Sequence, residues 1–361
     1  MLKRIIKIIG SLVGIVVLVF IVYLAYLMIS YKRIPDYQVL EPVNSDSGRM
    51  IRTGETLTAV TQNCGFGAYT SDFTFFMDGG KQSWAASKES AAACIDAAAD
   101  KALSFQPDFV LFQEVDTDAT RTYHLNEVEQ LINRFEGYSS VYAANYHSAF
   151  LFYPFYQPHG ASNSGILTLS RAGIGSAMRR SLEVSSGFNK IVDLDRCYSV
   201  SRIPVEGGKE LVLYNVHLSA YGNSDAIRTS QMTQLLNDMK GEYEAGNYCV
   251  CGGDFNHDFT GDSTQVFNGG AEVSHGWAMP FPEELLPDGI VRCLDYDDEE
   301  PVATCRNCDV PYGPDCMTFI VDGFLVSGNV RVEELHNIDT GFSYSDHCPV
   351  VMSFVLLNGR D

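Results

Sequence analysis

The strongest constraint on this chain is a short apolar run that ends in two glycines, a carboxylate and a carboxamide, at residues 249–256. The run is typical of a buried strand, and the glycines would let the backbone turn sharply and approach a ligand closely. Residues two apart at a strand end project to the same side, so Asp254 and Asn256 should face one spot. A proton acceptor beside an amide is suited to holding and deprotonating a water molecule.

Six more polar residues stand at the ends of apolar, strand-like segments. A buried acid such as Glu114, in Phe-Val-Leu-Phe-Gln-Glu, needs a metal or a charged partner. A lone histidine after an apolar strand is more often a satisfied core residue than a functional one, so each position alone is weak evidence. The six residues are Asn63, Glu114, His217, Asp322, Asp346 and His347.

Hydrophobic periodicity predicts an α/β fold with mixed sheets. We expect strands at 57–64, 108–115, 140–146, 165–171, 196–205, 210–218, 317–327, 330–335 and 348–356, and helices at 87–105, 123–135 and 224–244. Gly207-Gly208 should join two of these strands as a hairpin. No internal linker or repeat divides the segment, which favours one domain.

The order and flanks of the polar motifs resemble the endonuclease/exonuclease/phosphatase superfamily over about residues 57–356. The resemblance implies a four-layer α/β sandwich, in which two mixed β-sheets pack face to face with helices outside. It also implies that the polar residues gather at one end and that the chain hydrolyses phosphate esters.

The family places its metal-binding glutamate at the position of Glu114, with Asn63 nearby and Asp346 in the same acidic group. Oxygen ligands of this kind suit Mg²⁺ or Mn²⁺ rather than zinc. The resemblance therefore implies a divalent metal held by these three residues.

The resemblance also assigns catalytic roles. Asp254 would deprotonate the attacking water, which Asn256 would position. His347 would bind the phosphate and be held by Asp322, which keeps the imidazole charged and oriented. His217 would act on the phosphoryl or leaving oxygens, and the sequence does not indicate which acid orients it.

Substrate contacts are less defined. Arg121 and Arg171 are candidate phosphate ligands because arginines are scarce and both follow motif strands. The family often has Gly-Asn-Ala where this chain has Asn163-Ser164-Gly165, and Asn163 is the candidate to replace the missing carboxamide. The aromatic residues of segment 142–159 would stack on bases, contact lipid or simply pack in the core and loops.

The N-terminus predicts a membrane anchor. Lys3, Arg4 and Lys7 precede an uncharged apolar run from Ile8 to Ile29, which is long enough to cross a bilayer. The weak charge bias favours a single-pass anchor with an inside N-terminus and an extracytoplasmic domain; a cleaved signal peptide is the alternative. We expect an anchor at 1–33, a linker at 34–50 and a catalytic domain at 51–361.

The net charge of −20 opposes unaided binding to nucleic acid or to an anionic membrane, so divalent cations would have to mediate phosphate binding. No feature indicates an obligate protein partner.

Cys293, Cys305, Cys308 and Cys316 lie in a polar insertion. These four cysteines could form two disulfides, bind a structural zinc ion or remain free thiols. We expect no catalytic role for them. His257 and Asp258 have no family role and are expected at the surface.

The function that these features favour is divalent-metal-dependent hydrolysis of a phosphodiester, in nucleic acid or in a phospholipid head group. One alternative is a phosphomonoesterase of the inositol-phosphate kind, which needs more basic residues than this acidic chain offers. The other is a catalytically silent, membrane-tethered binding module, which the intact key positions disfavour.

Overall fold

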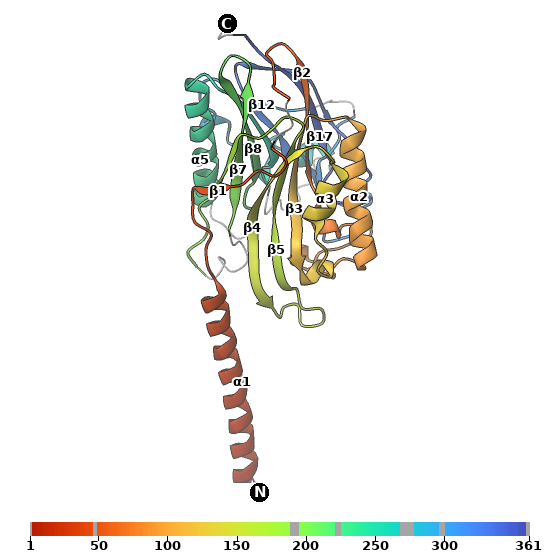
Figure 1. Ribbon diagram of the computed structural model, residues 1–361. Helices are drawn as coiled ribbons and strands as arrows, with labels where there is room; N and C mark the ends of the chain where they lie inside the picture. The colour runs from red at the N-terminus through yellow and green to blue at the C-terminus, as the bar shows by residue number, and fades with distance from the viewer. Residues whose placement is uncertain are drawn as a thin grey trace.

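Two β-sheets packed face to face form the centre of the chain, shown in Figure 1 as a computed structural model. The structure describes residues 2–45, 49–187, 195–220, 225–267, 278–295 and 300–358. In spatial order, the first sheet contains β1 (Gln38–Leu40), β6 (Ser176–Ser181), β7 (Cys197–Val205), β8 (Lys209–His217), β9 (Tyr248–Asp254), β15 (Asp322–Ser327) and β12 (Ile290–Cys293). The second contains β16 (Val330–Asn337), β17 (Val350–Leu356), β2 (Thr56–Asn63), β3 (Phe109–Ala119), β5 (Gly160–Ser170) and β4 (Ser139–Leu151).

Both sheets are mixed. The β8–β9 and β2–β3 pairs are parallel, whereas the other pairs within the two large sheets are antiparallel. Four short strands form two small pairs: β10 (His257–Asp258) with β11 (Met279–Pro280), and β13 (Cys305–Arg306) with β14 (Thr318–Phe319). The 3₁₀ turns are η1 (Gly65–Gly67), η2 (Phe76–Asp78), η3 (Thr120–Thr122) and η4 (Glu283–Leu285).

Helices cover the outer faces of both sheets. The second sheet is covered by α2 (Lys88–Ser104) and α3 (Glu127–Arg134), and the first by α5 (Asp225–Glu244). A further short helix, α6, spans Ser263–Phe267. Ser87 caps α2 by accepting a hydrogen bond from the Ser90 N–H, as helix N-caps commonly do. Apolar side chains fill the space between the sheets, so the four-layer sandwich predicted from the sequence is confirmed.

The apolar N-terminal run forms a helix, α1 (Leu2–Ser30), that projects from the domain (Figure 1). Its length and composition suffice to cross a membrane, and its apolar window is fully exposed. Beyond α1, the stretch expected as a linker contributes β1, whose Val39 pairs with Met178 of β6. Val43 forms an isolated bridge with Ser140 of β4.

The two glycines of the central motif lie inside β9 rather than after it. A Cβ on Gly253, whose φ is +154°, would meet the Val216 carbonyl oxygen at 2.0 Å. A Cβ on Gly252 would meet the Phe324 ring at 2.5 Å. The expected sharp turn is therefore wrong at these positions: they are glycine because a neighbouring strand and a core ring approach too closely for any side chain.

All ten cysteines are free and buried. Of the possibilities left open for Cys293, Cys305, Cys308 and Cys316, two disulfides are ruled out because all four are free thiols, and they form no zinc-type cluster among the described residues. Strand pairing places Cys293 and Cys305 in different sheets, because Cys293 pairs with Phe324 in β15 whereas Cys305 pairs with Phe319 in β14.

His257 and Asp258 are also buried, although they were expected at the surface. Burial lowers the pKa of His257 to about 4, and its Nδ1 lies 2.7 Å from the Phe255 carbonyl oxygen. Asp258 accepts hydrogen bonds from the backbone N–H groups of Thr260 and Ser263. Both residues therefore organise the loop that follows β9.

Candidate active site

The carboxyl ends of three strands bring polar side chains together. Asn63, His217 and Asp254 are the last residues of β2, β8 and β9. Because β8 runs parallel to β9, their final residues lie side by side in the register His217–Asp254. Behind them, a buried hydrogen bond from Gln113 Nε2 to Asn215 Oδ1 joins the two sheets at 2.8 Å.

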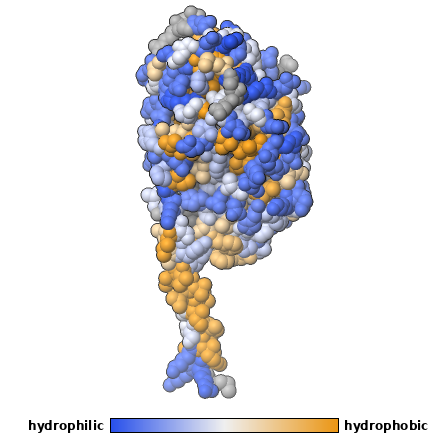
Figure 2. Space-filling view, viewed as in Figure 1, coloured by the Kyte–Doolittle hydropathy of each residue, from blue (hydrophilic) through white to orange (hydrophobic). Residues whose placement is uncertain are grey.

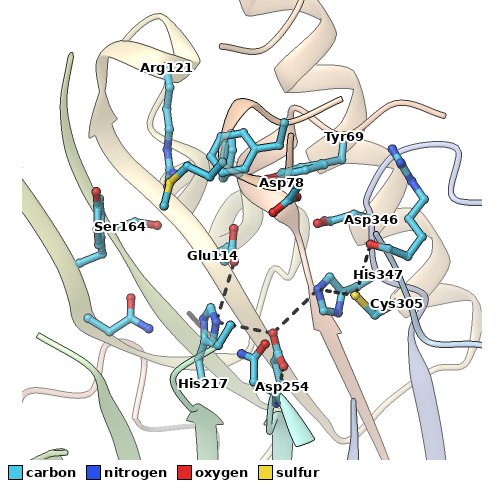
Figure 3. A pocket seen from close by; sticks show the side chains of 18 of the residues that line it. Tyr69, Asp78, Glu114, Arg121, Ser164, His217, Asp254, Cys305, Asp346 and His347 are labelled. Atoms are coloured by element: carbon cyan, nitrogen blue, oxygen red, sulfur yellow. Dashed lines mark hydrogen bonds and ion pairs between the residues drawn. The ribbon is translucent and has the colours of Figure 1, made fainter. Parts of the chain in front are cut away.

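Asp254 lies between two histidines (Figure 3). Its Oδ2 is 3.5 Å from His217 Nε2 and 3.8 Å from His347 Nε2, and it accepts a 3.0 Å hydrogen bond from Asn63 Nδ2. Its Oδ1 accepts the Asn256 N–H at 2.9 Å. Burial raises the pKa of Asp254 to about 6, so this carboxylate is a stronger base than an exposed one.

Asp322 holds His347. The two are linked at 2.7 Å between Oδ2 and Nδ1, and Asp322 pairs with Asp254 in the β15–β9 register. Burial alone would lower the pKa of His347, but Asp322, Cys305 and Asp254 raise it well above its usual value. Asp254, Asp322 and His347 offer ligand atoms within 4.8 Å of one another. Because Nδ1 is already engaged, the geometry fits a hydrogen-bonded chain better than a metal site.

His217 lies in a different environment. Burial, Arg196 and His347 lower its pKa well below the usual value, which favours the neutral imidazole. Its Nε2 faces Asp254 and, at 3.8 Å, Glu114 Oε1. Among the described residues its buried Nδ1 has no hydrogen-bond partner, so no acid among them orients this ring from behind.

Glu114 and Asp346 bring two carboxylates to the other side of the pocket (Figure 3). Glu114 has a φ of +52° at a register shift of β3 against β5, a conformation that costs free energy and redirects the side chain. Burial raises the pKa of Asp346 to about 7, opposed by His347 and reinforced by Glu114. Gly65 leaves the room that Asp346 needs, since a Cβ there would meet Asp346 Oδ1 at 2.6 Å.

Asn63 and Asn256 are both held by hydrogen bonds. Asn63 Oδ1 accepts the Gly65 N–H at 2.9 Å, and its Nδ2 donates toward Glu114 and Asp254. In this orientation Asn63 bridges the carboxylates as a donor, and a ligand role would require the amide to present its oxygen instead. Asn256, with a φ of +50°, donates from Nδ2 to the Leu218 carbonyl at 2.9 Å and lines the pocket.

Of the three predicted substrate contacts, only Arg121 lines the pocket. Arg121 forms a bidentate pair with Asp116 at 2.9 and 3.0 Å and lies 3.6 Å from the centre of the Phe66 ring. Asn163 is exposed and donates to the Asp118 carbonyl, because alternation along β5 turns its neighbour Ser164 inward instead. Arg171 does not reach the pocket and lies over the Tyr138 ring.

Several residues that line the pocket were not identified from the sequence. Asn145 carries a carboxamide whose buried Nδ2 has no partner among the described residues. Its position at a register shift of β4 against β5 gives no sequence signal. Others come from loops, a 3₁₀ turn and the short strand β13, and they include Tyr69, Asp78, Arg196 and Arg306. Cys305, from the insertion for which no catalytic role was expected, also lines the pocket, with its Sγ 3.5 Å from His347 Nε2. Tyr146 and His159, from the aromatic segment, also line it.

Comparison with known proteins identifies the class of protein. The family model described as "Endonuclease/Exonuclease/phosphatase family" matches residues 60–347. The chain belongs to this family of metal-dependent hydrolases that act on phosphate ester bonds. A search of curated proteins gives no match.

Solved structures show the same fold at low sequence identity. An endonuclease/exonuclease/phosphatase from Beutenbergia cavernae is 18% identical with a TM-score of 0.53, covering 84% of this chain and 72% of that one. The human Nocturnin catalytic domain is 16% identical with a TM-score of 0.51, covering 88% and 97%. ANGEL2, described as a 2′,3′-cyclic phosphatase, is 14% identical with a TM-score of 0.53, covering 83% and 96%.

Proposed function

We propose that this chain is a divalent-metal-dependent phosphodiesterase that uses Asp254 to deprotonate an attacking water. The observation that carries the proposal is the position of this carboxylate, between two histidines and beside the acidic pair Glu114 and Asp346 in one pocket. Hydrolysis of a phosphodiester needs a base, a cation and donors aimed at the phosphoryl oxygens. The pocket supplies the base and the donors from its own side chains.

The residues present fit a hard divalent cation. Two carboxylates, Glu114 and Asp346, face one pocket, and burial together with the nearby Glu114 raises the pKa of Asp346. A cation would relieve this repulsion, and all-oxygen donors suit Mg²⁺ or Mn²⁺. We propose Glu114 and Asp346 as its ligands, with Asn63 beside them. Such an ion would neutralise charge on the phosphoryl oxygens as it develops.

The two histidines would have different tasks. His347, charged through its hydrogen bond to Asp322, would donate from Nε2 to a phosphoryl oxygen. His217, neutral and close to Asp254, would contact the phosphoryl or leaving oxygen. At neutral pH the Asp254 carboxylate would accept the proton of a water placed by Asn256, so that attack proceeds without a covalent intermediate.

Substrate contacts would come from Arg121 and Asn145 rather than from Asn163 or Arg171. Arg121 is held by Asp116 and stacked on Phe66, and the buried Arg306 donates to the carbonyls of Thr70 and Phe73. Arg121 is thus fixed at one place in the pocket wall, and Arg306 is occupied by backbone carbonyls, so neither guanidinium can move to hold the extra phosphates of an inositol polyphosphate. This disfavours the monoesterase alternative.

We also propose that α1 is an uncleaved, single-pass anchor with the catalytic domain on the extracytoplasmic side. The basic residues before the apolar run favour an inside N-terminus. Residues 51–361 would form the catalytic domain, with the preceding segment fixed to it through β1.

Hydrolysis by the full chain in detergent tests the proposal. The substrates are bis(p-nitrophenyl) phosphate and p-nitrophenyl phosphate, with Mg²⁺, Mn²⁺ or EDTA, beside an Asp254→Ala variant. Metal-dependent cleavage of the diester that disappears in the variant is the expected result. Cleavage of the monoester alone would favour the monoesterase, and no turnover by the folded wild type would favour a binding role.

A further inference from the structure

The loop between β4 and β5 exposes a group of aromatic side chains, here called the aromatic tip. Its members are Phe152, Tyr153, Phe155 and Tyr156, which are 49%, 64%, 84% and 70% exposed. Large aromatic side chains contribute strongly to burial in cores and interfaces, so four exposed in one short loop indicate a surface that meets a partner. Figure 2 shows apolar surface at this end of the domain, next to the apolar helix.

The aromatic tip is fixed to α1. Tyr23 Oη donates to the Phe150 carbonyl at 3.2 Å and accepts the Phe152 N–H at 3.3 Å, while Tyr26 Oη accepts the Phe150 N–H at 3.1 Å. The Tyr23 and Phe152 rings also meet edge to face, 5.2 Å between centres. The loop therefore lies at a defined height along the helix.

That height corresponds to the membrane interface. The apolar run from Ile8 to Ile29 is about 32 Å long at 1.5 Å per residue, close to the thickness of the hydrocarbon layer. Tyr23 and Tyr26 lie about 9 and 4.5 Å before its end, in the outermost part of the hydrocarbon layer and next to the interface at which tyrosines are enriched. Any residue held against them, as Phe152 is, shares that depth when α1 spans a bilayer.

The same hairpin connects the aromatic tip to the pocket. Tyr146 in β4 and Ser164 in β5 line the pocket, and their strands continue toward α1 (Figure 1). Tyr153 packs edge to face on Phe76, and Phe76 packs on the pocket residue His159, with ring centres 5.8 and 5.7 Å apart. The pocket thus lies at the end of the domain that faces the membrane.

We infer that the aromatic tip enters the outer interface of the bilayer that α1 spans, so that the pocket takes the phosphodiester head group of a lipid in that bilayer. The inference rests on the proposed phosphodiesterase function for its substrate, but not for the position of the tip. The charge of the chain agrees with it, because a net charge of −20 disfavours nucleic acid, whereas aromatic insertion needs no basic surface.

The depth of the tip is tested with a nitroxide attached to Phe155→Cys in the full chain reconstituted in phosphatidylcholine liposomes. All native cysteines are buried, so the wild type treated with the same reagent should take up little nitroxide and serves as the labelling control. Glu206→Cys, in the turn between β7 and β8 at the opposite end of those strands from His217, is the matched control site. We expect oxygen to relax the nitroxide at position 155 more than a water-soluble nickel complex does. At position 206 we expect the nickel complex to relax it more. Equal access of the nickel complex to both sites would overturn the inference.

The substrate is tested with the double variant Phe152→Ser/Phe155→Ser, whose side chains are largely outside the core. Liposomes of phosphatidylcholine with sphingomyelin provide the lipid diesters, and bis(p-nitrophenyl) phosphate provides a soluble one. We expect at least a tenfold loss on the liposomes and a change of less than twofold on the soluble probe. An equal change on both, or cleavage of DNA or RNA but of no lipid by the wild type, would overturn the inference. If the wild type cleaves neither diester, the proposed function fails, while the nitroxide measurement still decides the position of the tip.

Discussion

His217 and His347 flank the same carboxylate, but their surroundings give them opposite protonation states. Burial without an acid behind it favours neutral His217, whereas the Asp322 carboxylate at 2.7 Å favours charged His347. One strong donor and one neutral imidazole beside Asp254 provide two different proton-transfer partners in a single pocket. A division of this kind is suited to a displacement in which one oxygen loses a proton and others gain negative charge.

The role of Asp254 is tested with Asp254→Asn, which keeps the shape of the side chain and removes the base. We expect kcat on bis(p-nitrophenyl) phosphate to fall by about 10²- to 10⁴-fold, the usual contribution of a general base. Because both Asp254 oxygens accept hydrogen bonds and an amide NH₂ cannot, the variant should unfold at a somewhat lower temperature than the wild type, and circular dichroism at the assay temperature checks that it remains folded. Asp100→Asn, in an exposed ion pair with Arg134, is the control and should retain full activity. A variant with wild-type kcat would contradict the assignment.

Alanine variants of Asn145 and Asn163 provide a matched comparison that tests substrate binding. Asn145→Ala removes a buried donor that has no partner among the described residues, so folding should be unaffected. We expect kcat/KM to fall about 10- to 100-fold, as for a hydrogen bond to a charged group. Asn163→Ala, exposed on the opposite side of its strand, should change kcat/KM less than twofold. The reverse ranking in steady-state kinetics would restore the role that the sequence suggested for Asn163.

At the residue scale, the sequence indicated the polar residues that we propose as catalytic, because each stands at the end of an apolar strand or in a recognisable motif. It did not indicate Asn145, since a register shift that turns one residue inward leaves no periodic signal. The strand alternation that predicts which side chains share a face fails wherever a bulge intervenes. A similar irregularity in β3 redirects Glu114, which was identified from its apolar flank and from the family resemblance rather than from strand alternation.

Among the elements, β9 depends most closely on its glycines. Gly253→Ala would place a methyl group within 2.0 Å of the Val216 carbonyl oxygen, so β8 and β9 must separate or Asp254 must move. We expect a loss of about 2–4 kcal/mol in the free energy of unfolding, together with reduced activity. Gly241→Ala in α5, where a Cβ meets nothing within 4 Å, is the control and should stabilise by about 0.5–1 kcal/mol. Denaturant titration of both variants provides the comparison.

The segment that follows α1 is held by a titratable contact. Asp195 lies 2.5 Å from His147 Nδ1 and accepts the Ile34 N–H at 2.6 Å, and His147 also contacts the backbone of Lys32. The hydrogen bond to Asp195 raises the pKa of His147, while burial and Arg179 oppose this. Because the folded-state pKa of His147 is raised, the His147–Asp195 contact contributes its full stabilisation below pH about 6.5, the unfolded-state pKa of histidine. This stabilisation is lost as the pH rises through the folded-state pKa of His147.

We therefore expect amide protection of residues 33–37, measured by hydrogen exchange and corrected for intrinsic rates, to fall about two- to fivefold between pH 6 and pH 9. His147→Gln should show the lower protection at both pH values. A wild-type segment whose protection does not change with pH would show that His147 does not hold it.

The main elements were predictable because strands and helices of ordinary length carry clear periodicity. β1 and β6 were not predicted, since β1 spans three residues and β6 reads Ser-Ala-Met-Arg-Arg-Ser, with few apolar positions. β6 buries Arg179 instead, whose guanidinium donates to the carbonyls of Ala144 and Asp195. A buried arginine that satisfies backbone carbonyls resembles a surface residue in the sequence.

For the whole molecule, retention of α1 distinguishes an anchor from a signal peptide. We expect the chain to remain in the membrane fraction after carbonate extraction at high pH, with the mass of the full sequence. Protease added to the outside of intact cells should degrade the domain. A soluble product that begins near residue 34 would instead show that the segment is cleaved.

The four-layer architecture was predictable at this scale, whereas the fixed placement of the domain against α1 depends on contacts between residues about 127 positions apart.

The contacts of Tyr23 and Tyr26 with the β4–β5 loop have a kinetic consequence. If α1 spans a bilayer and the pocket takes a lipid of that bilayer, as we propose, a domain held at one height over its own leaflet would meet substrate only by lateral diffusion, so it would search a surface rather than a volume. Its rate on lipid should then follow the mole fraction of substrate in that leaflet and should be insensitive to the total amount of lipid added. Enzyme and substrate in separate vesicles should hardly react, whereas fusion of the two populations should start the reaction.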